Sequence, residues 1–206
     1  MASTVIHMCV ANEVNKYLKK DDKGILIGSI APDISKHINE TKKYSHFLDN
    51  VDNDIPNIDR FLNKYKNYLN YDFVMGYYIH LYTDYLWFKY FIPNFIKKDF
   101  IYTLDNKKVN LSDKEKLEYV YNDYTNLNIK LLDEYEMDLS IFYEDIPNFK
   151  NIIEEIPMDK LQLIIDKAGL IIKNSKEEKS FIFDIEEINK FIEFCVSDII
   201  TQLEKV

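Results

Sequence analysis

The sequence predicts an all-α fold, and three observations support this prediction. Apolar residues recur at helical spacing in several long stretches, most clearly over residues 73–91. Glycine and proline, which favour tight turns, are scarce, at 4 and 5 among 206 residues. Two capping boxes, at Ser112 with Glu115 and at Asp184 with Glu187, mark the starts of two helices. These features favour long helices over a many-stranded sandwich.

The length and composition predict one globular domain. A chain of 206 residues is long enough for a single domain with a substantial core. It is 47% hydrophobic and 15% aromatic, which is typical of a folded protein and not of a disordered one. No internal repeat and no linker rich in glycine, proline or serine interrupts the chain. We therefore expect a single multi-helix domain over residues 1–206.

The net charge and the apolar pattern of the sequence allow predictions about binding partners and cellular location. The formal net charge of −9 repels polyanions, so extended binding to nucleic acid is not expected and a small or zwitterionic substrate is favoured. Residues 1–10 lack the basic and apolar regions of a signal peptide, and charges within residues 73–91 argue against a transmembrane segment. Cys9 and Cys195 each lie in an apolar helical stripe, which predicts buried thiols. These features predict a cytoplasmic protein.

The first helix is expected over residues 3–20, where an apolar stripe turns His7 toward the interior and lysines suit the C-terminal end. Residues 22–33 contain a short apolar run that Pro32 should end. Asp33 would then lie at a turn after a buried segment. Asp33 could also serve only as the N-cap of whatever follows it.

Two further helices are expected before the middle of the chain. A helix over about residues 55–69 leads into the aromatic helix of residues 73–91, which should end or kink near Pro93. His80 and Asp84 lie four residues apart in that helix and therefore share one face. A neutral imidazole and a carboxylate placed in this way can bind one metal ion. The alternative is that these two side chains only form a hydrogen bond with each other in a helical core.

The second half of the chain is expected to be helical apart from one extended pair. That pair lies within the charged and irregular residues 97–111, around residues 100–104 and 107–111. Apolar side chains at helical spacing predict the remaining helices. These run from Ser112 to about residue 131, from Pro157 to about residue 171, and from Asp184 to about residue 203.

The order of the histidines resembles that of a known enzyme family. Along the chain come His7, the run Gly-Ser-Ile-Ala-Pro-Asp that ends at Asp33, the triplet Ser-His-Phe around His46, and Gly-x3-His80-x3-Asp84. This order resembles the zinc-dependent phospholipase C family, which shares an all-helical fold with single-strand-specific nucleases. The resemblance covers roughly the first 90 residues. The fourth histidine, His37, lies among polar residues and is expected to be solvated.

The resemblance implies a metal site and a reaction. Asp33, His46, His80 and Asp84 match the family's first zinc site, and His7 matches a ligand of a second zinc that Asp84 would bridge. Such nitrogen and oxygen ligands suit zinc, and iron, manganese or nickel would also accept them. In that family the ions activate water and hold the phosphate of a phosphodiester. The implied function is a metal-dependent phosphoester hydrolase (a phosphodiesterase) acting on small phosphoesters or phospholipid head groups, with Asp33 as an alternative general base.

The chain also departs from the family pattern. Secreted members begin with a Trp whose amine and carbonyl bind zinc, whereas position 1 here is Met. No histidine follows His80, so the family's later ligands for a third zinc have no counterpart and one or two ions are expected. The lost ligands leave a second hypothesis open, a degenerate and non-catalytic helical protein that binds metal or a partner. Phosphohydrolases of the HD type need an adjacent His-Asp pair, which this sequence lacks.

Overall fold

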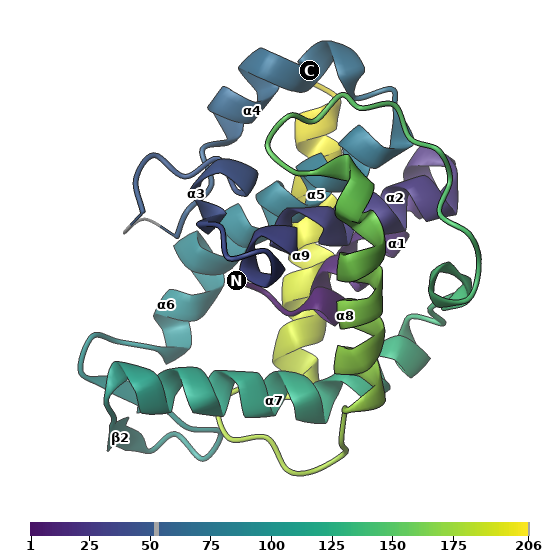
Figure 1. The fold of residues 1–206 in the computed structure, drawn as a ribbon. Coiled ribbons are helices and arrows are strands. Elements are labelled where there is room, and N and C mark those ends of the chain that lie inside the picture. The colour runs from purple at the N-terminus through teal and green to yellow at the C-terminus, as the bar shows by residue number, and fades with distance from the viewer. Residues whose placement is uncertain (52–53, 206) are drawn as a thin grey trace.

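The computed structural model describes residues 1–51 and 54–205, and it consists mainly of α-helices (Figure 1). The prediction of a helical fold is therefore confirmed at this level. The helices in chain order are α1 (Thr4–Leu18), α2 (Asp22–Ile30), α3 (Lys42–Ser45), α4 (Ile58–Tyr65), α5 (Asp72–Leu86), α6 (Ile92–Phe95), α7 (Asp113–Glu134), α8 (Leu161–Lys173) and α9 (Ile185–Leu203). Within the described ranges, no helix is both long and apolar enough to cross a bilayer.

The expected extended pair is present as a short hairpin. Strand β1 (Phe100–Tyr102) pairs antiparallel with β2 (Lys108–Asn110), and Ile101 faces Val109 across the pair. The two strands fall inside the two stretches that the sequence singled out. Because Ile101 is fully buried, the hairpin is fixed to the helical core on one face.

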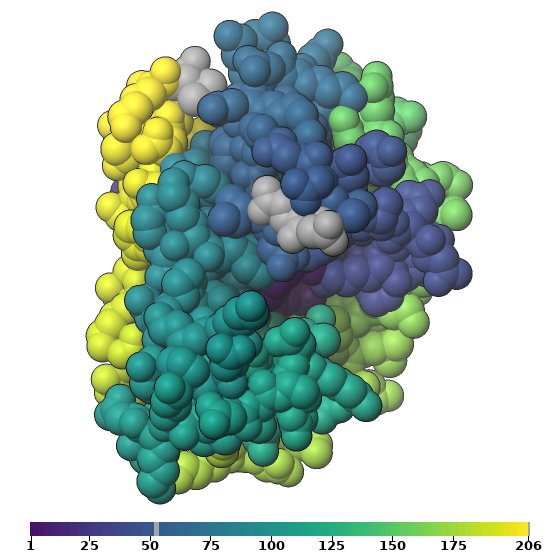
Figure 2. Space-filling model, turned by 90° about the vertical axis from the view of Figure 1, so that its left-hand side faces the viewer, coloured from purple at the N-terminus to yellow at the C-terminus, as the bar shows by residue number. Residues whose placement is uncertain are grey.

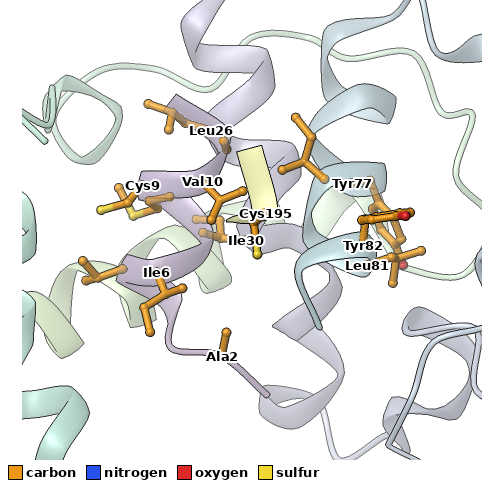
Figure 3. Packing of buried hydrophobic residues seen from close by; sticks show 14 of the residues in the cluster. Ala2, Ile6, Cys9, Val10, Leu26, Ile30, Tyr77, Leu81, Tyr82 and Cys195 are labelled. Carbon is orange, nitrogen blue, oxygen red and sulfur yellow. The ribbon is translucent and has the colours of Figure 1, made fainter. Parts of the chain in front are cut away.

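Helix α5 lies at the centre of the fold and contacts α1, α2, α4 and α9. In Figure 1, α9 runs the height of the molecule through the middle of the view, and α7 lies across its lower end next to α8. The core contains Ile6 and Val10 from α1, Ile30 from α2, Leu81 from α5 and Cys195 from α9, and in Figure 3 Val10, Ile30 and Cys195 lie near one another in the middle of the view. Both cysteines are buried and unpaired, as predicted.

Two glycines allow α2 and α5 to pack backbone against backbone. A Cβ atom added to Gly28 would overlap the carbonyl oxygen of Phe73, and one added to Gly76 would overlap the carbonyl oxygen of Ile25. Any larger side chain at either glycine would therefore push the two helices apart. This close approach places the end of α2 beside the face of α5 that carries His80.

We expect Gly28→Ala or Gly76→Ala to lower the free energy of unfolding by about 2–4 kcal/mol, because the clash is with backbone that cannot rotate away. Gly169→Ala is the matched control, since its added Cβ would lie 3.4 Å from the side chain of Phe142, an ordinary contact. Alanine also has the higher helix propensity, so the control should be neutral or slightly stabilising. Urea unfolding measures both effects, and equal stability of all variants would contradict this packing.

One expectation about a helix end is wrong in detail. After α2 the chain does not turn at Pro32 but continues as a 3₁₀ helix, η1 (Ala31–His37), and Asp33 lies inside it. Proline is tolerated there because the first turn of a helix needs no amide donor from it. Asp33 is therefore not an N-cap.

The central helix changes close to Pro93, as the sequence predicts. Beyond Leu86 the chain widens into a π-helical turn, Trp87–Phe91, in which the Ile92 amide donates to the Trp87 carbonyl. Pro93 then lies in the first turn of α6. Because proline cannot donate the next amide bond, the helical ladder shifts register just ahead of it.

Candidate metal centre

The five residues that the sequence singled out as metal ligands converge in the structure. His7 comes from α1, Asp33 from η1, His46 from the residue that follows α3, and His80 and Asp84 from α5. All five are buried, with exposed fractions between 0% and 5%. Their nitrogen and carboxylate atoms form two groups of three, His7 with His80 and Asp84, and Asp33 with His46 and His80. His80 belongs to both groups.

The distances between these atoms fit a shared metal ion. The Nε2 atom of His46 lies 3.4 Å from Asp33 Oδ1 and 3.2 Å from His80 Nε2. Asp84 Oδ2 lies 3.8 Å from both of these Nε2 atoms. Ligand atoms bound tetrahedrally at about 2.0–2.1 Å from zinc are about 3.3 Å from one another. The distances among Asp33, His46 and His80 are thus close to those of ligands on one ion, and Asp84 Oδ2 lies slightly farther from the two histidines.

His7 extends the cluster on the other side of Asp84. Its Nε2 atom lies 3.4 Å from Asp84 Oδ1, while Asp84 Oδ2 faces His46 and His80. The His7 ring stacks on His80 with 3.7 Å between ring centroids and 11° between planes. Asp84 thus has one oxygen toward each side, the arrangement of a bridging carboxylate.

The hydrogen bonds of His80 orient its lone pair. His80 Nδ1 lies 2.7 Å from the carbonyl oxygen of Ser29, and because a carbonyl only accepts, Nδ1 carries the proton. A neutral His80 therefore points an unprotonated Nε2 into the cluster. A histidine ligand fixed by a backbone carbonyl in this way is a regular feature of metal sites.

His46 has a comparable partner in Ser45. His46 Nδ1 lies 2.9 Å from Ser45 Oγ, whose own proton can go to Ser35 Oγ or to the Lys42 carbonyl. In that arrangement Ser45 accepts from Nδ1, and His46 also turns a bare Nε2 toward His80. In this tautomer two lone pairs lie 3.2 Å apart and repel each other unless a metal ion or a proton lies between them.

Several cluster atoms have no hydrogen-bond partner. Across residues 1–51 and 54–205, six buried side-chain nitrogen or oxygen atoms are unpartnered, and four of them are His7 Nδ1, His7 Nε2, Asp33 Oδ1 and Asp84 Oδ2. Among these atoms, Asp33 Oδ1 has an ion pair with Lys36 Nζ at 3.1 Å. Unpartnered buried polar atoms are costly, and their concentration here is explained if they bind an ion.

The protonation states also suit metal binding. Burial opposes ionisation of Asp33, but Lys36 and the neighbouring histidines outweigh it and hold the pKa of Asp33 well below its ordinary value. Burial likewise opposes ionisation of Asp84, yet His7 keeps that pKa lowered. For His80, burial is the main cause that lowers the pKa well below its ordinary value. At neutral pH the cluster thus offers carboxylates and a neutral His80 imidazole, the forms that bind metal.

A cavity of about 490 Å³ lies beside the cluster, between η1, α7 and α8. Asp33 is the cluster residue that also lines this cavity, and Met1 and Ala2 lie at its inner end. In Figure 2 the purple start of the chain is visible at the bottom of a hollow between neighbouring segments. Tyr124 donates a hydrogen bond to the Met1 carbonyl, and the Ala2 amide donates to Asp84 Oδ1. The cavity therefore leads to the cluster.

The structure separates His37 from the other histidines. It lies at the end of η1, is partly exposed and lines the cavity, but it belongs to neither ligand group. The sequence did not indicate that Ser29 and Ser45 orient the histidine ligands, or that Lys36 offsets the charge of Asp33. Ser45 is adjacent to His46 in the chain, but nothing in the sequence pattern marks the contact of Ser29 with His80.

We expect Ser45→Ala to lower the metal affinity roughly 10–100-fold, because it removes the partner that fixes the His46 tautomer. A competition titration with a chelator measures the affinity, and circular dichroism checks that the helices persist. Ser197→Ala, at an exposed position on α9, is the matched control and should leave the affinity unchanged. Equal affinities for the wild type and Ser45→Ala would show that Ser45 does not orient the ligand.

Comparison of the chain with models of known families, with characterised proteins and with solved structures finds no match. The likeness to the zinc-dependent phospholipase C family therefore rests on the short motifs that contain the five cluster residues.

Proposed function

We propose that this chain is a metal-dependent hydrolase of small phosphoesters, with one or two zinc-type ions held by His7, Asp33, His46, His80 and Asp84. One observation carries the proposal: buried imidazoles and carboxylates meet at metal-ligand spacing, with unpartnered atoms, at the end of a cavity. The order of these ligands along the chain, which resembles that of the zinc-dependent phospholipase C family, supports the same function and a related fold.

The reaction would take place at the Asp33 side of the cluster. When bound, a zinc-type ion would lower the pKa of a coordinated water to about 7 and offset charge that develops on phosphate oxygens. Asp33 lies on the cavity wall, where its carboxylate can reach an attacking water and accept its proton. Lys36, next to Asp33, supplies a positive charge for a phosphate oxygen.

A screen of metal-loaded protein tests this proposal. Chain loaded in turn with zinc, manganese, iron or nickel would be assayed on small nitrophenyl phosphomonoesters and phosphodiesters. We expect turnover that a chelator abolishes and added metal restores. Small diesters should also be cleaved faster than single-stranded DNA, because the net charge of −9 repels a long polyanion.

The screen also separates the proposal from its alternative. Full metal loading without turnover of any phosphoester would refute the hydrolase and favour the degenerate, non-catalytic relative. Rapid cleavage of single-stranded DNA without turnover of small diesters would instead overturn the substrate preference.

A further inference from the structure

The cavity beside the cluster has a wall that the proposed reaction does not use. This wall is formed by α8 and carries Ile164, Lys167, Leu170 and Ile171. The opposite side, from η1, carries Asp33 and Lys36, so a molecule in the cavity would contact both the metal cluster and α8. What binds along α8 would therefore determine which phosphoesters are accepted.

Lys167 is an unpaired cation on this wall. It is half-buried, and in the described part of the chain it has neither an ion pair nor a hydrogen bond. The positive charge of Lys167 also acts on His37, whose pKa is lowered mainly by burial and to a smaller extent by Lys167. A half-buried lysine without a partner loses hydration that an anionic ligand can replace. In a chain of net charge −9, two lysines against one carboxylate make this cavity locally positive.

The other α8 side chains on this wall are apolar, whereas polar residues from other elements, among them Asn128, also line the cavity. Ile164 is buried at the inner end, whereas Leu170 and Ile171 are 48% and 41% exposed at the mouth. Such side chains suit an apolar or aromatic group. Asn128 on α7 is 1% exposed, and its Oδ1 has no partner within the described residues. This oxygen can accept a hydrogen bond from a donor group on a ligand.

We propose that the cavity selects a phosphoester whose leaving group is apolar and carries a second anionic group. This inference rests on the proposed function. The phosphate lies at the Asp33 and Lys36 end, the apolar part packs on Ile164 and Ile171, and Lys167 pairs with the second anion. An anionic substrate is thus preferred, in contrast to the zwitterionic one that the overall charge favours.

Three phosphonates that cannot be hydrolysed test this selection by calorimetry on metal-loaded protein. They are phenylphosphonate and its derivatives with a carboxylate or a trimethylammonium group on the ring carbon opposite the phosphorus. We expect the carboxylate compound to bind about tenfold tighter than phenylphosphonate, as one charge-assisted contact allows, and the cationic compound to bind more weakly. Lys167→Ala should abolish the advantage of the carboxylate, and Lys167→Arg should retain it.

Lys173→Ala is the matched control, because Lys173 is an exposed lysine of the same helix that does not line the cavity. It should bind all three phosphonates like the wild type. Equal affinity of the wild type for the neutral and carboxylate compounds, or an advantage that survives Lys167→Ala, would overturn the proposal. Because no phosphonate is turned over, these results do not depend on catalysis. Failure of every phosphoester in the activity screen would refute the hydrolase while leaving this anion selection intact.

Discussion

Protein purified without a chelator should contain one or two transition-metal ions per chain, and His80→Ala should lose at least one of them. His80 belongs to both ligand groups, and its Nε2 lone pair is directed into the cluster by the Ser29 carbonyl. Removing this ligand should therefore weaken the binding of every ion in the cluster. Asp33→Ala should also lose an ion, because Asp33 Oδ1 lies 3.4 Å from His46 Nε2. Elemental analysis of the purified variants measures the content.

His37→Ala is the control for this experiment, since His37 is a histidine outside both ligand groups. Its metal content should match that of the wild type. Metal bound only to the folded state also stabilises it, by about 4 kcal/mol when the free ion exceeds its dissociation constant a thousandfold. A protein that contains no metal, and whose melting temperature added zinc leaves unchanged, would refute the metal centre.

Local patterns explain why much of the fold is predictable from the sequence. The capping box at Ser112 and Glu115 forms with both of its hydrogen bonds, and Asp184 accepts the Glu187 amide at the start of α9. Both partners of each cap lie within one helical turn, so the sequence alone is enough to recognise these signals. Asp123 accepts hydrogen bonds from the amides of residues 181–183, which lie 58–60 positions later in the chain, so no local sequence pattern predicts this contact. It attaches the segment before α9 to α7.

The candidate site was predictable to a similar extent. The spacing of His80 and Asp84 places them on one face of a helix, whereas His7, Asp33 and His46 could be linked to them only by resemblance. Gly28 and Gly76 let α2 approach α5, which places the end of α2 and the following Asp33 near His80 and Asp84, and the packing of α1 and α3 adds His7 and His46. Lys167 was not predictable as part of the site, because it is one of many lysines on helix surfaces. Only the packing of α8 against η1 places it on the cavity that Asp33 also lines.

Asp33→Asn should abolish or severely reduce phosphoester hydrolysis, and the metal content of the variant reveals the role of Asp33. The side chain is close to His46, lies beside Lys36 and lines the cavity, so both roles are geometrically open to it. A ligand needs the negative oxygen to hold the ion, and its loss should remove metal and activity together. A general base needs the negative oxygen only to accept a proton, and the ion does not depend on it. Loss of a base should keep the metal while kcat falls by about 10²–10⁴-fold.

Metal content and kcat therefore have to be measured on the same preparation of the variant. Asp159→Asn, at an exposed aspartate in the short turn before α8, makes the same change in charge and should alter neither quantity. If Asp33→Asn becomes fully active once excess zinc restores its metal, then Asp33 is a ligand and not the base. If the variant retains both its metal and its full rate without added zinc, Asp33 has neither role. In that case a proton acceptor would have to be sought elsewhere along the cavity wall.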